Sequence, residues 1–131
     1  MTELKPRHFC LEDEPTLGPP IEGLVRRPIA GVGTQIMEVR LDKGFKVPRH
    51  NHPEEQWSYM ISGRLQFWTD EEPEGFIVGP GDVVHFPPNA WHEAVALDDV
   101  LEIDVFWPIR PQLLGPLHDA YGKEVAPGVE A

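Results

Sequence analysis

Potential metal ligands gather in the segment HNHPEEQ and at one later histidine. His50 and His52 lie two positions apart, and alternate side chains of an extended strand project to the same side, so both imidazoles can bind one ion. Gln56 begins the next run of β-forming residues and can add an amide oxygen. His92 follows a proline/asparagine turn that returns the chain toward the same side. These four side chains are predicted to hold one divalent metal ion: zinc, manganese, nickel, iron or cobalt.

Glycines and a proline stand at regular sequence distances from these ligands. The two motifs are G-x5-H-x-H-x3-Q-x6-G over residues 44–63 and G-x5-P-x-N-x2-H over residues 81–92. Together they resemble the two motifs of the cupin superfamily, and the resemblance covers residues 34–107. It implies an all-β cupin fold, a double-stranded β-helix or jelly-roll-like barrel, in which the three histidines bind a metal. Three residues depart from the family pattern: Gln56 for the usual glutamate, Asn89 for a glycine and Ala96 for an asparagine.

The glutamine has a chemical consequence. Three neutral imidazoles and a neutral amide leave the charge of a divalent metal uncompensated, which makes it a stronger Lewis acid toward an anionic or enolate-like oxygen. Glu54 and Glu55 are alternatives to Gln56: the spelling H-x-H-x-x-E-Q allows Glu55, whereas Gln56 has the ligand spacing of the motif.

A narrower resemblance involves the late segment D-V-F-x-P-x-R together with H-x-H-P-x-E-Q. Both are similar to the small pectin-degradation cupins, which convert unsaturated uronates to a linear keto form. The resemblance implies that Asp104, Phe106 and Arg110 belong to the pocket. A period of two places Asp104 and Phe106 on one face, a carboxylate there can act as general acid or base, and Arg110 can reach a substrate carboxylate.

Plainer interpretations of these residues remain open. The alternation around Asp104 is also what a half-exposed strand shows, and Arg110 can form a surface ion pair. If Gln56 points inward, Met60 does so too and becomes, with Phe106, a candidate substrate contact. Trp57 and Tyr59 then face outward, where aromatic rings favour a contact between subunits.

The residues therefore indicate a metal-dependent enzyme of isomerase or lyase type that acts on a small oxygen-rich carbonyl compound, with a uronate-like acid as one candidate. An Fe(II)-dependent dioxygenase, a polyketide cyclase and a non-catalytic small-molecule binder are the alternatives, because many functions share this fold.

Short runs of β-forming residues separated by glycine and proline turns must position the site. We expect an N-terminal arm at residues 1–33 that adds an edge strand or crosses to a partner subunit, a barrel at 34–110 and a tail at 111–131. A short helix is expected at residues 112–121.

The charge balance narrows the partners. The chain of 131 residues has 11 basic and 22 acidic side chains and a formal charge of −11. This charge disfavours nucleic acid and anionic membranes. The single cysteine, Cys10, and the absence of a long apolar run lead us to expect a cytoplasmic homodimer that binds a small molecule.

Overall fold

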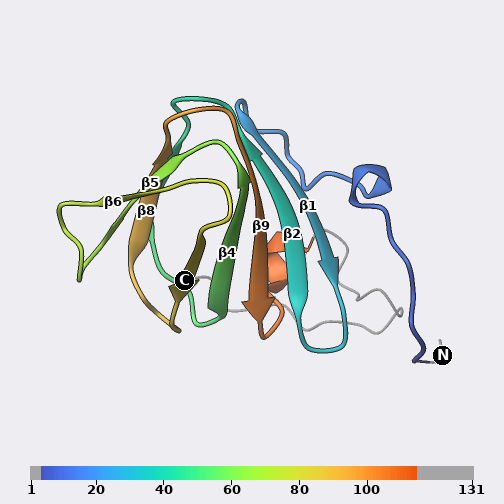
Figure 1. Cartoon of the computed structure of the whole chain (residues 1–131). Helices are drawn as coiled ribbons and strands as arrows, with labels where there is room; N and C mark the ends of the chain where they lie inside the picture. Colours follow the sequence, from blue (N-terminus) through green and yellow to red (C-terminus); the bar gives the residue numbers. More distant parts are fainter. Residues whose placement is uncertain (1–3, 115–131) are drawn as a thin grey trace.

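The computed structural model describes residues 4–114, which fold into two antiparallel β-sheets packed face to face (Figure 1). The five-stranded sheet has the order β1-β2-β9-β4-β7, and the four-stranded sheet has the order β3-β8-β5-β6. The strands are β1 Leu24–Ala30, β2 Gln35–Leu41, β3 Lys46–His50, β4 Glu55–Ser62, β5 Leu65–Thr69, β6 Phe76–Val78, β7 Val83–Phe86, β8 His92–Ala96 and β9 Val100–Trp107. Two 3-10 turns, η1 Leu11–Asp13 and η2 Pro111–Leu113, flank the sheets.

This architecture confirms the predicted all-β fold. The short turn η2 occupies the start of the expected C-terminal helix, and the rest of that helix lies outside the described residues. Residues 24–30 of the expected arm form β1, which pairs with β2 along its whole length as an edge strand. No helix in residues 4–114 is long and apolar enough to cross a bilayer.

The inward faces of the strands form the core. On β2, Met37, Val39 and Leu41 are buried, as the period of two predicts, while Ile36 and Arg40 on the other face are exposed. Apolar side chains from both sheets close the interior in one cluster. This packing holds the sheets together and fixes which side chains of β4 and β9 look into the sandwich.

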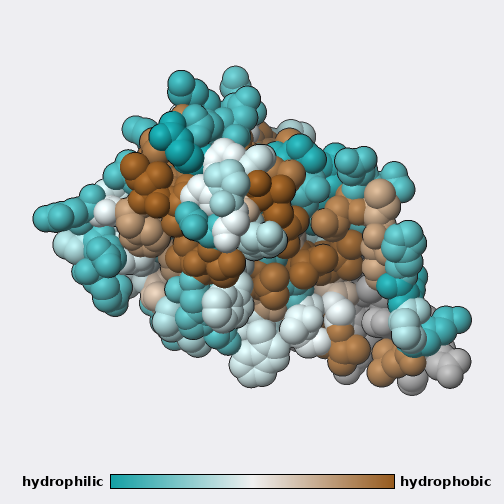
Figure 2. Space-filling view, viewed as in Figure 1, coloured by the Kyte–Doolittle hydropathy of each residue, from teal (hydrophilic) through white to brown (hydrophobic). Residues whose placement is uncertain are grey.

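The outer face of the five-stranded sheet is apolar over a wide area (Figure 2). Trp57 is 47% exposed and Tyr59 is 46% exposed, so both rings face outward as predicted. Other exposed apolar side chains of the same sheet are Val25, Ile36, Ile61, Val83 and Trp107. A surface of this kind is typical of a protein–protein contact.

Two loops bring the histidine-bearing segments together. The turn before β8 contains Asn89 at a φ of 66°, a left-handed conformation that asparagine tolerates better than most residues. Its backbone N–H donates to the carbonyl oxygen of His52 at 2.8 Å, and the Asn51 side chain donates to the Asn89 carbonyl at 3.2 Å. These bonds tie the second motif to the loop that carries His52.

Gly63 makes the tight turn between β4 and β5. Its φ is +78°, and a Cβ atom at this position would overlap the carbonyl oxygen of Asp99. Glycine alone satisfies both the dihedral angle and the close approach. The turn keeps β4, which carries Gln56, in register with β9.

Candidate functional site

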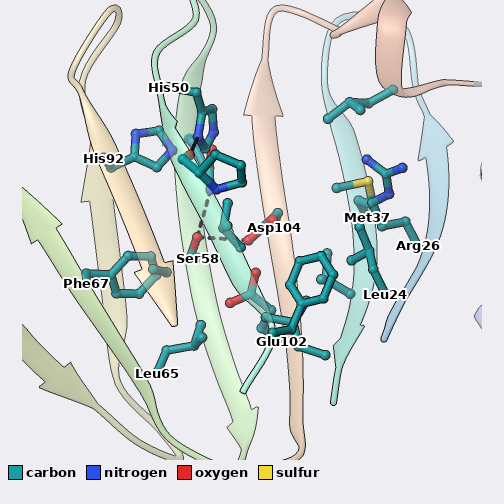
Figure 3. Close-up of a pocket in the computed structure, with 18 of the residues that line it drawn as sticks. Leu24, Arg26, Met37, His50, Ser58, Leu65, Phe67, His92, Glu102 and Asp104 are labelled. Atoms are coloured by element: carbon teal, nitrogen blue, oxygen red, sulfur yellow. Dashed lines mark hydrogen bonds between the residues drawn. The ribbon is translucent and has the colours of Figure 1, made fainter. Parts of the chain in front are cut away.

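The three predicted histidines meet at one end of the sandwich. His50 ends β3 and pairs in register with His92, the first residue of β8, while His52 lies in the loop after β3. One ring nitrogen from each imidazole lies within 4.8 Å of the other two. Figure 3 shows His50 and His92 side by side at the top of the cavity.

Backbone carbonyls set the tautomer of all three rings. The Nδ1 atoms of His50, His52 and His92 lie 2.8, 2.9 and 2.9 Å from the carbonyl oxygens of Pro48, Glu54 and Ala90. A carbonyl oxygen can only accept, so each Nδ1 carries the hydrogen and each Nε2 keeps a free lone pair. The Nε2 atom of His92 is buried and has no hydrogen-bond partner among the described residues.

Gln56 adds a fourth lone pair to this group. Its Oε1 atom lies 3.0 Å from Nε2 of His52, so two acceptors face each other. In this orientation the amide presents its oxygen to His52, and Nε2 of Gln56 donates to Oγ of Ser58 at 2.9 Å. The Ser58 hydroxyl in turn donates to Oδ1 of Asp104 at 2.8 Å. Opposed lone pairs repel, and a cation placed among the four acceptors would remove that repulsion.

Burial keeps the imidazoles neutral. Loss of solvation lowers the pKa of His52 to about 4 and that of His92 to about 3, and the positive charge of Arg110 adds to both shifts. The same desolvation lowers the pKa of His50. All three rings therefore have their lone pairs available at neutral pH, as metal binding requires.

The two neighbouring glutamates contact other side chains. Glu55 points outward and contacts His85. Glu54 is buried, and its Oε1 atom lies 3.4 Å from Nε of Arg110. Of the three ligand candidates in this loop, Gln56 is thus the one whose oxygen faces the histidines.

Two buried carboxyl groups lie deeper on β9. Glu102 and Asp104 occupy successive inward positions and are 6% exposed each. Burial and the nearby Asp104 charge raise the pKa of Glu102 well above its usual range, and burial raises the pKa of Asp104 to about 6. The sequence analysis did not assign Glu102 to the site, although it shares the inward parity of Asp104. Two carboxyl groups this close and this buried disfavour double ionisation.

These groups line a cavity of about 490 Å³ between the sheets. Its polar end carries the histidines, Ser58 and Asp104, and in Figure 3 Glu102 lies below Asp104. Apolar side chains from both sheets form the rest of the wall: Leu24, Met37, Val39, Leu41, Leu65, Phe67 and Ala94. The site therefore combines a cluster of donor atoms with an enclosed space for a small molecule.

Comparison with known proteins now identifies the family. The sequence profile of the cupin domain matches residues 37–107, more than half of the chain. The chain belongs to the cupin domain family. No curated protein matches this cupin.

Solved structures resemble this cupin along most of its length. KdgF from Halomonas sp. is 27% identical with a TM-score of 0.74, over 84% of this chain and 100% of that one. An RmlC-like cupin from Shewanella frigidimarina is 26% identical with a TM-score of 0.69, over 80% of this chain and 94% of that one. Oxalate decarboxylase from Bacillus subtilis, a protein described with Mn(II) centres, is 28% identical with a TM-score of 0.65. This cupin covers only 29% of its length.

The remaining predicted site residues lie in different surroundings. Phe106 and Arg110 line the cavity, and the Arg110 guanidinium lies 5.1 Å from the centre of the Phe106 ring. Arg110 does form an ion pair, but with buried Glu54 rather than on the surface. Met60 is fully buried in the core and is not among the residues that line the cavity, so its predicted contact with substrate gains no support.

Proposed function

We propose that this cupin is a metal-dependent enzyme of isomerase or lyase type that acts on a small carbonyl acid. The observation that carries the proposal is the cluster of His50, His52 and His92, whose ligand atoms lie within 4.8 Å of one another, with the amide oxygen of Gln56 beside His52. Neutral nitrogen and oxygen donors fit a divalent transition metal, and the Mn(II) centres of oxalate decarboxylase support the same class of ion.

The metal would supply Lewis acidity toward the oxygen atoms of the substrate. Because the four donors are uncharged at neutral pH, none of them reduces that acidity. The protein holds the donors in place through the three backbone carbonyls and through Ser58. A substrate with two neighbouring oxygen atoms suits such a centre.

Asp104 is the group we assign to proton transfer. It lines the cavity, one of its oxygens accepts a hydrogen bond from Ser58, and its pKa of about 6 lies close to neutral pH. A carboxyl group with such a pKa can both take and return a proton at a carbon next to a carbonyl. The resemblance to pectin-degradation cupins and the structural likeness to KdgF support a uronate-like acid as one substrate.

Metal content is the first test. Protein purified without a metal-affinity tag should contain about one divalent metal per chain, and His52→Ala should lose it. No metal in the purified protein, and none bound after incubation with Mn²⁺, Ni²⁺, Zn²⁺ or Fe²⁺, would refute the proposal.

Turnover is the second test. With an unsaturated uronate as substrate, the vinyl proton signal in the NMR spectrum should disappear in the presence of wild-type protein and persist with Asp104→Asn at equal metal content. Equal rates for both proteins would show that Asp104 does not transfer the proton. Consumption of O₂ during turnover by an iron-loaded protein would instead support the dioxygenase alternative.

A further inference from the structure

Arg26 is a positively charged side chain in the cavity that pairs with no acidic residue among residues 4–114. We propose that Arg26 binds the carboxylate of the substrate and that the apolar wall beside it receives a hydrocarbon segment. The substrate class would be a carboxylic acid with oxygen atoms at the end near the histidines and few hydroxyl groups along its body, which among the carbonyl acids of the proposed function disfavours a polyhydroxylated uronate. Within this proposal, only the expectation of oxygen atoms near the histidines rests on the proposed function.

The partners of the other arginines make Arg26 unusual. Within residues 4–114, the Arg26 guanidinium has neither a hydrogen bond nor an ion pair, although it lines the cavity and is partly buried. Arginines with an acidic partner are Arg27 and Arg40 with Glu38, Arg49 with Asp70, Arg64 with Asp98, and Arg110 with Glu54. Among the described residues, Arg26 is thus a cavity arginine without a counter-charge.

The groups around Arg26 do not neutralise it. Strand register places Arg26 beside Val39 and Val39 beside Glu102, so the arginine and the acid lie in one row two strands apart, about 10 Å between Cα atoms. The Arg26 guanidinium and the Glu102 carboxyl form no ion pair. Arg26 instead repels Arg110. Burial lowers the pKa of Arg110, and the positive charge of Arg26 lowers it further. An anion near both guanidinium groups would relieve this repulsion.

The wall between Arg26 and the polar end selects against hydroxyl groups. Figure 3 shows Leu24 and Met37 on the side of Arg26 and Leu65 and Phe67 across the cavity. These side chains offer no hydrogen-bond partner, so a hydroxyl buried against them, away from the carboxyl group of Glu102, loses its hydrogen bonds to water without replacement. A hydrocarbon segment meets no such penalty and gains from burial.

The test compares probes of equal carbon number. Binding of hexanoate, its neutral analogue hexanamide, and gluconate, a six-carbon acid with five hydroxyl groups, is measured by calorimetry on the full chain as purified. We expect wild-type protein to bind hexanoate at least tenfold more tightly than either hexanamide or gluconate. Arg26→Met should lose the preference for hexanoate over hexanamide, and Arg26→Lys should keep part of it.

Control variants test whether a cation other than Arg26 causes the preference for hexanoate over hexanamide. Arg40→Met, which removes a paired arginine on the outer face, should keep the preference. The proposal is overturned if hexanoate and hexanamide bind equally to wild-type protein, or if the preference survives Arg26→Met. It is also overturned if Arg110→Met or His52→Ala alone abolishes the preference, because the carboxylate would then meet Arg110 or a bound metal. Tighter binding of gluconate would overturn the hydrocarbon part. Metal content of the same samples reports separately on the proposed function.

Discussion

Replacement of Ser58 by alanine tests the link between the histidine cluster and Asp104. The Ser58 hydroxyl accepts from the Gln56 amide at 2.9 Å and donates to Asp104 at 2.8 Å, and all three residues are buried. Ser58→Ala removes both bonds and leaves an amide N–H and a carboxylate oxygen without partners. Each unsatisfied buried group costs about 1–3 kcal/mol, so we expect the free energy of unfolding to fall by about 2–6 kcal/mol.

The same change should weaken metal binding. Without Ser58, the Gln56 amide is free to rotate and to turn its NH₂ group toward Nε2 of His52. Loss of a group that orients a metal ligand typically costs about 10- to 100-fold in affinity. The pKa of Asp104 should also rise above its value of about 6, because the hydrogen bond from Ser58 lowers that pKa. Any activity that needs ionised Asp104 should then begin at higher pH.

The assays are urea unfolding of metal-free protein, calorimetric titration with Mn²⁺ and Ni²⁺, and the pH profile of turnover. Ser62→Ala is the matched control, since Ser62 is exposed at the end of the same strand. It should change stability by less than about 0.5 kcal/mol and leave metal affinity unaltered. If Ser58→Ala matched Ser62→Ala in metal affinity, the idea that Ser58 orients a ligating amide would be wrong.

Three other expectations follow from the core, the turns and the outer face. Burial raises the pKa of Glu102 above its unfolded value, so its contribution to stability is full below about pH 4.5 and falls as pH rises toward the folded pKa. Glu102→Gln should therefore match wild-type stability near pH 4.5 and exceed it at pH 8 by up to about 1.4 kcal/mol per pH unit, whereas a pH-independent difference in urea unfolding would contradict this reasoning. Gly63→Ala should cost more than about 2 kcal/mol because its Cβ meets the Asp99 carbonyl, while Gly44→Ala, also at positive φ but with open space around it, should cost less. The predicted homodimer should give the mass of two chains in light scattering, and a double change of Trp57 and Tyr59 to serine should give one; a wild-type mass of one chain would exclude it.

Much of the site follows from short-range pattern. Once Gln56 is taken to face inward, the period of two places Ser58 and Met60 inside and Trp57 and Tyr59 outside, and the structure has them so. The tolerance of asparagine for positive φ likewise explains why Asn89 can make the turn before β8. These inferences succeed because strand parity and turn dihedral angles are local properties of the chain.

What the sequence could not provide depends on distant contacts. The expected edge strand of the arm had no predicted bounds, and in the structure it is β1, which contains Pro28 and lies at the sheet edge where a missing N–H is tolerated. The pairing of Arg110 with Glu54 joins residues 56 positions apart and gives no sign in either segment. The unpaired state of Arg26 is harder still to predict, because it requires knowing where every nearby carboxylate points.

The charges of the cavity explain how an acidic protein can select an anion. The formal charge of −11 belongs mostly to surface groups, and solvent and salt screen it over about 8 Å at physiological ionic strength. Inside the cavity the imidazoles are neutral, and the lining groups that can carry charge are the cations Arg26, Lys46 and Arg110 and the carboxyl groups of Glu102 and Asp104, whose pKa values burial raises. Poorly screened interior charges act more strongly than exposed ones. Selection of a carboxylate therefore depends on the few buried groups near it, and a divalent cation at the histidines would strengthen the same preference.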